Sequence, residues 1–410
     1  MSEAADTLHL LRERGFVQQI SDEAALASLL AKGSVRFYAG FDPTASSLHV
    51  GSMIPLMAMA HLARAGHKPI AVLGGGTAMV GDPSGRTELR QMMTVETIRQ
   101  NRQAIEPQVR RFLADAGDSA LVVDNADWLA PLNYLEFLRD IGRHFSVNRM
   151  LAAEAYRQRM EKGLSFIEFN YQILQAYDYL VLHRKFGCAL QVGGDDQWGN
   201  ILAGTDLIRR LHQAETYALT FPLITTAAGA KMGKTAAGAV WLAADRTSPF
   251  DFYQYFVNVD DRDVGRFLKL LTFVPIDEVH RLESAQGAEL RAAKQVLALE
   301  TTAIVHGKEA AQMAQEAARA AFGGGGGELV PTYALDRAEL AAGMKIVDLL
   351  FAAGLAASKS AARRLVEQGG VRWGERKVGS VDDKLGADEI GADGTLIHAG
   401  KKHVRRIVLK

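Results

Sequence analysis

The chain has 410 residues, 48% of them hydrophobic and 23% charged, with 47 basic residues against 47 acidic ones. These values are typical of a globular protein of two or three domains and exclude a disordered or fibrous chain. No apolar run approaches the roughly 18 residues that a membrane-spanning helix needs. The first residues lack the basic start and apolar block of a signal peptide, so we expect a cytoplasmic protein. The single cysteine, Cys188, excludes an internal disulfide and a cysteine-based zinc site.

The balanced net charge hides an asymmetry between the two ends of the chain. Residues 344–410 carry 13 Lys and Arg against 8 Asp and Glu, and the remaining residues carry 34 against 39. A basic C-terminal module suggests an anionic partner, with nucleic acid as the first candidate. From charge alone, a solvated basic surface without a partner stays equally open.

The first 225 residues alternate strand-like and helix-like segments. The expected strands are 35–41, 69–73, 121–123, 189–192 and 222–226, and the expected helices include 49–65 and 94–114. Such alternation predicts an α/β fold, a Rossmann-like nucleotide-binding domain with a parallel sheet and helices on both faces. Ligands of such sheets bind beyond the carboxyl ends of the strands.

The rest of the chain no longer alternates strand-like and helix-like segments. Residues 249–322 are helical in pattern, and five consecutive glycines at 323–327 indicate a flexible linker. The expected domains are a catalytic domain, a helical domain, the Gly-rich linker and a small α+β domain, at residues 1–246, 247–322, 323–337 and 338–410.

The segment YAGFDPTASSLHVGS at residues 38–52 runs from a strand through a polar loop into a helix start. Backbone N–H groups at a helix start form an anion site, and Gly51 leaves room for a flat ring against the backbone. Thr44 and His49 are donors placed to meet a polyphosphate. Taken alone, a histidine at such a place is more often a capping or packing residue.

The segment KMGKT at residues 231–235 lies between runs of small residues. Lys231 and Lys234 on such a loop suit a mobile cationic flap that neutralises charge developing on a leaving group. A merely solvated loop is the alternative for this segment by itself.

Taken together, the two segments resemble the two signatures of class I aminoacyl-tRNA synthetases. Further strings resemble the bacterial tyrosyl-tRNA synthetases: GDPSGR at 81–86, HFSVNRML at 144–151, FNYQILQAYDYL at 169–180 and QVGGDDQWGNI at 191–201. Residues 249–322 are similar to the helical domain of that family, and residues 354–378 resemble an S4-type RNA-binding domain. The resemblance therefore covers essentially the whole chain.

The resemblance implies a ligase that forms tyrosyl-adenylate and pyrophosphate from L-tyrosine and ATP and then charges the 3′-terminal adenosine of tRNA(Tyr). For the amino acid, it implies that the phenolic hydroxyl is bound by Tyr38 and Asp178, and the ammonium group by Asp82, Tyr171 and Gln175. It also implies a homodimer that packs through the nucleotide-binding domain.

The positions matched to ATP form a second group. The resemblance places Asp42, Gly194 and Asp196 near the ribose and adenosine, together with His49, Gly51 and Ser52 of the first signature and Lys234 of the second. It places Gln197 at the reacting carboxylate and α-phosphate, and the departing pyrophosphate near Thr44, His49, Lys231, Lys234 and Thr235. Because pyrophosphate is a good leaving group, catalysis needs positioning and charge stabilisation rather than a nucleophilic residue. Mg²⁺ is expected to arrive with ATP, and no metal site of the protein's own is expected.

Some positions depart from the family pattern or have ordinary structural explanations. Ser52 stands where the family often has a second histidine, Gly233 where the signature usually has serine, and Ala39 where some members can contact the ribose. Trp198 and Cys188 are interpreted as packing residues. Asn125 and Trp128 resemble positions near the substrate pocket, without an assigned role.

The basic tail is the candidate RNA-binding region. Ser358 is expected to cap a helix that presents cations on one face, followed by a strand at residues 371–378. The candidate phosphate-binding residues are Lys359, Arg363, Arg364, Arg372, Arg376 and Lys377. Contacts of this kind are largely electrostatic and salt-sensitive.

Two alternatives to the ligase stay open from the sequence. One is a non-catalytic RNA-binding protein on a synthetase-derived scaffold, and the other is an adenylyltransferase of another small acid. The presence of His49, Asp82, Asp178, Lys231 and Lys234 favours the ligase, because a decayed site loses its charged groups first.

Overall fold

The computed structural model describes most of the chain: residues 7–84, 92–152, 156–157, 160, 163–227, 229, 232–235, 238–323, 330–340, 343–400 and 403–410. Two compact units emerge from the contacts within it. Unit 1 comprises residues 1–224 and 269–271, and unit 2 comprises residues 225–268 and 272–410. The expected boundaries of the three domains and the linker stay predictions.

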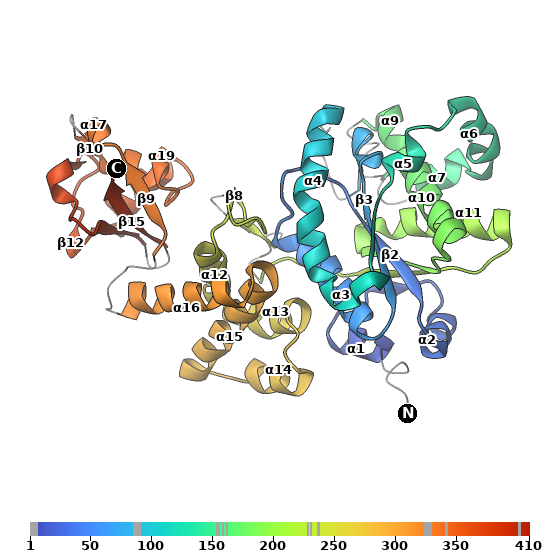
Figure 1. The fold of residues 1–410 in the computed structure, drawn as a ribbon, viewed down its shortest axis with the longest axis horizontal. Coiled ribbons are helices and arrows are strands. Elements are labelled where there is room, and N and C mark those ends of the chain that lie inside the picture. The colour runs from blue at the N-terminus through green and yellow to red at the C-terminus, as the bar shows by residue number, and fades with distance from the viewer. Residues whose placement is uncertain are drawn as a thin grey trace. The chain divides into compact units, whose positions relative to one another are not determined.

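Unit 1 is built on a six-stranded sheet in the order β1-β6-β5-β2-β3-β4 (Figure 1). Its strands are β1 (Gln19–Ile20), β2 (Arg36–Phe41), β3 (Lys68–Leu73), β4 (Leu121–Asp124), β5 (Leu190–Gly194) and β6 (Tyr217–Phe221). Every pairing is parallel except that of β1, a short antiparallel strand at the edge. The α/β fold with a parallel sheet is thereby confirmed.

The strand expected at residues 222–226 was wrong in its position. The last strand, β6, ends at Phe221, just before Pro222. Proline has no N–H to donate to a neighbouring strand, so the ladder stops there. The residues that precede it, Tyr217 to Phe221, form the ladder with β5 instead.

Helices cover both faces of the sheet, as expected. Figure 1 shows α3 (Met53–Arg64) and α4 (Val95–Phe112) on one side of the strands and α10 (Tyr171–Phe186) and α11 (Trp198–His212) on the other. Helix α3 is apolar on almost every side and is buried along most of its length. Helix α10 ends at Gly187, whose positive φ of 66° lets its N–H close the last turn.

The strand order changes direction beside β2. In register, Tyr38 of β2 lies between Ile70 of β3 and Gln191 of β5. The chain moves to β3 on one side and returns through β5 on the other, which leaves a crevice at the carboxyl ends of these strands. This crevice is where the ligand site is expected.

The remaining helices of unit 1 are short. They are α1 (Thr7–Glu13), α2 (Glu23–Lys32), α5 (Ala126–Leu129), α6 (Tyr134–Asp140), α7 (Val147–Ala152) and α9 (Phe166–Phe169), with single 3₁₀ turns at Val50–Ser52, Thr77–Met79, Ala114–Ser119, Gly142–His144 and Asp195–Gln197.

The second signature lies near the start of unit 2, and a series of helices follows it. A hairpin of two short strands, β7 (Lys234–Thr235) and β8 (Gly238–Ala239), precedes α12 (Pro249–Val257), α13 (Val264–Leu271), α14 (Ile276–Glu283), α15 (Gly287–His306) and α16 (Lys308–Gly323). The last three residues of α13, 269–271, are those grouped with unit 1. The helical pattern expected over residues 249–322 is confirmed. Gly323 ends α16, and Gly324 to Gly327 of the expected linker lie outside the described residues.

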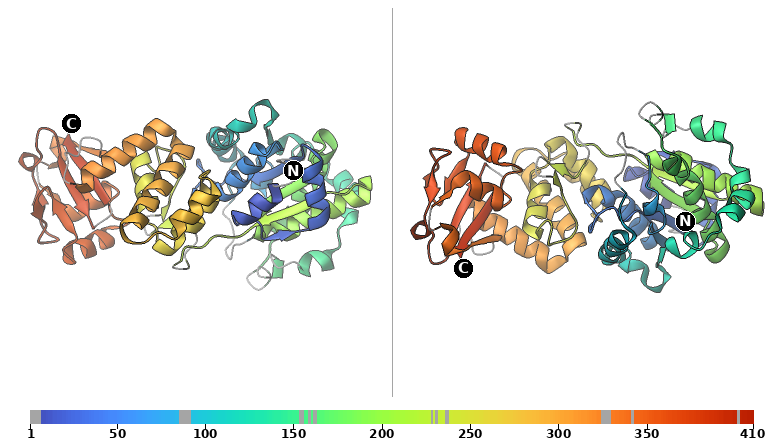
Figure 2. Two further views of the ribbon diagram at one scale, coloured as in Figure 1. Left: turned by 90° about the horizontal axis from the view of Figure 1, so that it is seen from below. Right: turned by 90° about the horizontal axis from the view of Figure 1, so that it is seen from above.

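The C-terminal part of unit 2 is a small α+β fold. Its five-stranded sheet has the order β12-β11-β14-β15-β9 and appears as one layer in Figure 2. The elements are β9 (Thr332–Leu335), α17 (Arg337–Leu340), β10 (Met344–Lys345), α18 (Ile346–Ala352), α19 (Lys359–Glu367), β11 (Val371–Trp373), β12 (Arg376–Lys377), β13 (Lys384–Leu385), a 3₁₀ turn (Ala387–Glu389), β14 (Thr395–Ala399) and β15 (His403–Leu409).

Two details of this fold bear on the sequence predictions. Ser358 caps α19 as expected, since its Oγ accepts from the Ala361 N–H at 3.1 Å. The single strand expected over residues 371–378 is instead the hairpin β11–β12, because Gly374 adopts a positive φ of 54° and turns the chain. Across the part of the chain that the structure describes, no helix is long and apolar enough to cross a membrane.

Candidate active site

The crevice of unit 1 gathers polar side chains from the ends of β2, β3 and β5 and from α10. The Tyr38 side chain, on β2, is only 1% exposed, and its hydroxyl finds no hydrogen-bond partner among the described residues. Burial and the nearby Asp178 raise the pKa of Tyr38 well above its ordinary value, so this hydroxyl is neutral. An unpaired buried hydroxyl costs free energy and is a place where a ligand would complete the site.

Asp178 is the second buried group at this end. Its two carboxylate oxygens accept from Trp128 Nε1 at 2.7 Å and from Asn125 Nδ2 at 2.9 Å. Burial raises the pKa of Asp178 to about 7, although both hydrogen bonds favour the ionised form. A carboxylate can accept about four hydrogen bonds, so Asp178 keeps capacity for a further donor.

Asn125 and Trp128 thus receive the role that the sequence left open. The Asn125 side-chain oxygen also accepts from the Gly76 N–H at 2.7 Å, and its nitrogen lies 3.0 Å from Thr77 Oγ1. Both residues hold the Asp178 carboxylate in one orientation through uncharged donors.

Asp42 lies on the other side of Thr77. Its carboxylate accepts from Thr77 Oγ1 at 2.8 Å and from the Tyr171 hydroxyl at 3.0 Å. Burial, together with the carboxylates of Asp42, Asp82 and Asp178, raises the pKa of Tyr171. Asp42 lies within hydrogen-bond distance of this phenol, and the negative charges of Asp82 and Asp178 also act on it, which makes this part of the unit a favourable place for a cationic group.

Asp82 and the start of α11 complete the crevice. Asp82 accepts from the Ser84 N–H at 2.9 Å and from Gln197 Nε2 at 2.7 Å. Asn200 Nδ2 lies 3.1 Å from Gln197 Oε1 and 3.2 Å from Gln175 Oε1. The structure therefore brings the predicted residues Asp82, Gln175 and Gln197 into one network.

The three glycines after β3 are each required by a close approach. A Cβ on Gly74 would lie 2.0 Å from Asp42 Oδ1, and a Cβ on Gly75 would lie 2.3 Å from Asp124 Oδ1. A Cβ on Gly76 would lie 2.9 Å from a methyl group of Leu129. A side chain at any of the three positions would force the neighbouring Asp42, Asp124 or Leu129 side chain to move.

The first signature lies at the start of a 3₁₀ turn that leads into α3. His49 caps this turn, because its Nδ1 accepts from the Gly51 N–H at 3.0 Å. His49 and Thr44 are exposed, and Gly51 and Ser52 are half-buried. His49 therefore combines a structural cap with a ring that solvent and a ligand can reach.

The aspartates after β5 have different surroundings. Asp195 Oδ1 accepts from Gln19 Nε2 at 2.6 Å and from Thr220 Oγ1 at 2.9 Å, so it ties the edge strand to the sheet. A Cβ on Gly194 would lie 2.7 Å from Asp196 Oδ1. Gly194 and Asp196 therefore lie against each other just after β5, and their expected place near the ribose and adenosine stays a prediction.

The second signature belongs to unit 2 and is described there by itself. Lys231 lies outside the described residues, and only the backbone of Lys234 and Thr235 is described, as strand β7. Gly233 has a positive φ of 78°, and its N–H donates to the Tyr255 hydroxyl at 3.2 Å. Gly233 thus suits a turn that a serine would strain.

The six candidate RNA-binding residues are all exposed on the C-terminal fold. Two of them form ion pairs with acidic neighbours, Lys359 with Asp348 at 2.7 Å and Arg376 with Glu389 at 2.8 Å. Such exposed pairs are weak and open readily for a phosphate.

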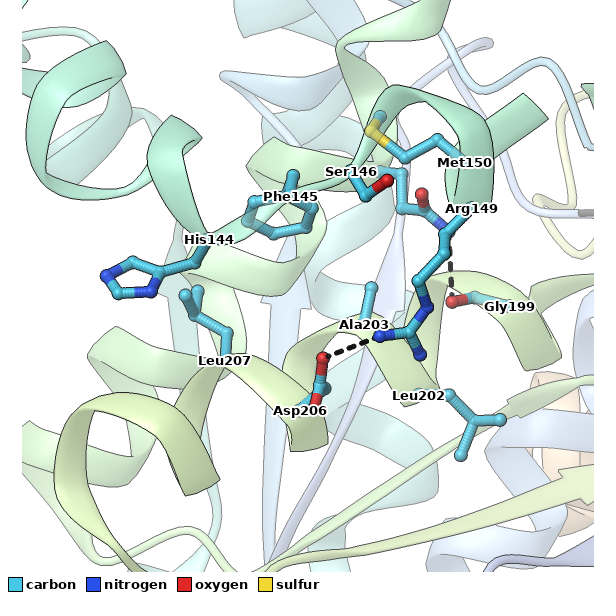
Figure 3. Close-up of a pocket in the computed structure, with 11 residues that line it drawn as sticks. His144, Phe145, Ser146, Arg149, Met150, Gly199, Leu202, Ala203, Asp206 and Leu207 are labelled. Atoms are coloured by element: carbon cyan, nitrogen blue, oxygen red, sulfur yellow. Dashed lines mark hydrogen bonds and ion pairs between the residues drawn. The ribbon is translucent and has the colours of Figure 1, made fainter. Parts of the chain in front are cut away.

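A separate cavity of about 210 Å³ lies against α7, α10 and α11 (Figure 3). At its wall, Gln172 Nε2 donates to the Gly199 carbonyl at 3.0 Å, and Arg149 approaches Asp206 at 3.6 Å. None of the predicted site residues lines it. The cavity is therefore distinct from the crevice.

Two residues of the crevice were absent from the sequence predictions. Thr77 follows the glycine turn after β3, and Asn200 follows Gln197 by one helical turn on α11. Thr77 could have been found in the sequence because it closely follows the end of a strand. Asn200 could have been found because it lies one helical turn after the predicted Gln197. Within the described residues, no group of three or more His, Cys, Asp or Glu side chains could hold a metal ion.

Comparison with known proteins agrees with this geometry. The family of class I tRNA synthetases for tryptophan and tyrosine matches residues 30–323, and a tyrosine–tRNA ligase C-terminal domain matches residues 326–407. Tyrosine–tRNA ligases of Clostridium botulinum and Clostridium tetani are each 50% identical, over 98% of this chain and 98% of their own length.

Solved structures give the same result. A C-terminally truncated mitochondrial tyrosyl-tRNA synthetase of Aspergillus nidulans has a TM-score of 0.69 at 33% identity and covers 77% of this chain and 94% of its own. A tyrosyl-tRNA synthetase of Archaeoglobus fulgidus, complexed with L-tyrosine, shares the fold at a TM-score of 0.58 and 18% identity, over 76% of this chain and 100% of its own. The chain belongs to the tyrosyl-tRNA synthetases of class I.

Proposed function

We propose that the crevice of unit 1 binds L-tyrosine and ATP, forms tyrosyl-adenylate with release of pyrophosphate, and passes the tyrosyl group to the 3′-terminal adenosine of tRNA(Tyr). The observation that carries the proposal is that a buried phenol without a hydrogen-bond partner, Tyr38, lies near the buried carboxylate of Asp178. The match to tyrosine–tRNA ligases over nearly the whole length of both chains supports the same activity.

Tyr38 and Asp178 read the phenolic hydroxyl of the substrate. The substrate hydroxyl donates to Asp178 and accepts from Tyr38, which gives the Tyr38 hydroxyl the partner that it lacks. Phenylalanine would leave both groups desolvated and unpaired, and this penalty exceeds the loss of a single contact.

The ammonium group of the substrate lies among Asp82, Tyr171 and Gln175. The carboxylates near Tyr171 supply the negative potential that a cation needs there. Asn200 hydrogen-bonds both Gln175 and Gln197 and so orients their amides. Gln197 contacts the reacting carboxylate and the α-phosphate of the substrates.

ATP lies along the first signature and the lip of the crevice. His49, Gly51, Ser52 and Asp42, together with Gly194 and Asp196, hold the adenosine and ribose. Thr44 and His49, with Lys231, Lys234 and Thr235 of the second signature, stabilise the departing pyrophosphate. Mg²⁺ arrives with ATP, held mainly by phosphate oxygens and water. The tRNA is held by the exposed cations of the C-terminal fold, and the enzyme acts in the cytoplasm.

We also propose a homodimer formed through unit 1. Large apolar side chains are exposed on α6, α7 and α9, which lie at one end of this unit (Figure 1), including Leu135 at 74% and Phe166 at 72%. Exposed patches of this kind mark protein interfaces. Charged substitutions at both positions, Leu135→Glu and Phe166→Glu, should give a monomer by sedimentation analysis. A dimer that persists would contradict this interface.

Charging of tRNA(Tyr) with labelled tyrosine tests the function. The full chain should form acid-precipitable tyrosyl-tRNA, and the Asp178→Ala variant should form none. The control is Asp195→Ala, which removes an aspartate with a structural role; the fraction of this variant that folds should keep part of the charging activity. An RNA-binding protein without catalysis would bind tRNA and charge none.

A further inference from the structure

The second signature is flanked on its N-terminal side by a clamp of two charged residues. Asp263 is 2% exposed, and its carboxylate accepts from the Ala227 N–H at 2.9 Å and from Arg266 NH2 at 2.5 Å. The same Arg266 nitrogen donates to the Thr225 carbonyl at 2.6 Å. A buried carboxylate is stable only with such partners, so the clamp fixes the backbone just before the signature.

The middle of the signature is held from α12. The half-buried Tyr255 hydroxyl accepts from the Gly233 N–H at 3.2 Å, and the Gly233 carbonyl accepts from the Val240 N–H at 2.8 Å. Met232 is 4% exposed, so its side chain is packed and not free in solvent. The backbone on both sides of Lys234 is thus tied to α12 and to the opposite strand, β8.

The exit from the signature is fixed as well. The Trp241 N–H donates to Thr247 Oγ1 at 3.0 Å, and the Arg246 guanidinium stacks 3.4 Å from the centre of the Trp241 ring. Helix α12 begins shortly after Arg246, at Pro249, so the helix that carries Tyr255 follows directly from the fixed exit.

We propose that Asp263, Arg266 and Tyr255 are positioning residues for adenylate formation, which set the backbone that carries the second signature. This inference rests on the proposed role of Lys234 in stabilising pyrophosphate. None of the three residues needs to touch a substrate. A loop held near its productive geometry loses less freedom when the transition state forms, so the anchors act on the rate.

The expected effects differ between the anchors. Tyr255→Phe removes one neutral hydrogen bond, worth a factor of roughly 2 to 13 in rate. Asp263→Asn loosens the charged clamp, and the misplacement of a catalytic group by a remote substitution can cost about 100-fold. The dissociation constant of tyrosine should not change, because all predicted tyrosine-binding residues belong to unit 1.

Matched controls exist on the same elements. Arg262→Ala breaks the exposed Arg262–Asp260 pair on the turn that also carries Asp263. Tyr253→Phe removes a hydroxyl of α12 that bonds Gln315. Both controls should keep the wild-type rate of adenylate formation.

The test is a double-mutant cycle measured by single-turnover adenylate formation in the full-length enzyme. Each anchor variant is made alone and together with Lys234→Ala, and thermal unfolding identifies variants that do not fold. We expect the anchor variants to be slow alone, to cost much less in the Lys234→Ala background, and to be cut faster by trypsin after Lys231 and Lys234.

The outcomes separate the two ideas. If Lys234→Ala keeps the wild-type rate, the proposed role of the lysine fails and the inference falls with it. If Lys234→Ala is slow but folded Tyr255→Phe and Asp263→Asn keep the wild-type rate, only the inference is overturned. Equal losses with and without Lys234 would also overturn it, because the anchors would then act by another route.

Discussion

Tyr38→Phe should make the free protein more stable and less selective at the same time. The Tyr38 hydroxyl is fully desolvated and has no partner among the described residues. A buried unpaired hydroxyl costs about 1–3 kcal/mol, so its removal should raise the free energy of unfolding by about 1 kcal/mol. For a unit of this size, that corresponds to a rise of roughly 2–4 °C in Tm.

The loss of selectivity follows from the same atom. In the tyrosine complex the hydroxyl gains a neutral hydrogen bond, worth about 0.5–1.5 kcal/mol. The ratio of kcat/KM for tyrosine to that for phenylalanine should therefore fall by a factor of roughly 2 to 13. Asp178→Ala should reduce the ratio far more, because it removes a charged acceptor and leaves Asn125 and Trp128 without their partner.

The assay is ATP–pyrophosphate exchange with both amino acids, together with thermal unfolding without substrates. Tyr179→Phe is a suitable control, because its hydroxyl donates to the Tyr217 carbonyl and should lower stability when lost. A Tyr38→Phe variant that keeps its full preference for tyrosine, or that is clearly destabilised, would show that Tyr38 is a packing residue.

Three further predictions concern charge and domain roles. Lys234→Ala should raise the activation free energy of adenylate formation by about 2–4 kcal/mol and leave the tyrosine dissociation constant almost unchanged. Pre-steady-state rates at saturating substrates measure this effect. Burial raises the pKa of Asp178 to about 7, so between about pH 4 and pH 7 the folded protein holds a proton that the unfolded chain has released, and above this range Asp178 is a charged acceptor. As the pH rises from about 4 to about 7, the free energy of unfolding of the wild type should therefore fall relative to that of Asp178→Asn, and above pH 7 the difference between the two should stay level. Denaturant titrations across this range measure both free energies, and a difference that does not change with pH would contradict this prediction. Ending the chain within the glycines at 323–327 should leave adenylate formation intact and weaken charging of tRNA(Tyr), and salt should weaken charging by the full chain; a truncated enzyme that charges as well as the full chain would refute the role of the tail.

The positions of the site residues along the chain were accessible from the sequence. Parallel strands bring their carboxyl ends to one edge, so the alternation of strands and helices predicts that the segments after the strands lie near each other, and the resemblance singled out Asp42, Asp82 and Gly194 in them. The resemblance also gave Tyr171, Gln175 and Asp178, whose spacing is compatible with one face of α10. Periodicity gives only these neighbourhoods, and the choice of the individual residues came from the resemblance to the family.

The contacts between these residues were not accessible. That Asn125 links Thr77 to Asp178 depends on how β4 and α10 pack, and no local pattern encodes that distance. The two adjacent aspartates after β5 also look alike in sequence, although Asp195 binds Gln19 of the edge strand and Thr220 of β6, and Asp196 lies against Gly194. The end of β6 was misplaced because its apolar pattern continues past Pro222, where the missing N–H decides the boundary.

The most direct test of the account is ATP–pyrophosphate exchange by the full chain with each of the twenty amino acids in turn. The arrangement of Tyr38 and Asp178 predicts exchange that depends on tyrosine, with phenylalanine far weaker and the other amino acids inactive. Exchange that is strongest with an amino acid lacking a phenol, or no exchange with tyrosine by the folded protein, would contradict the account.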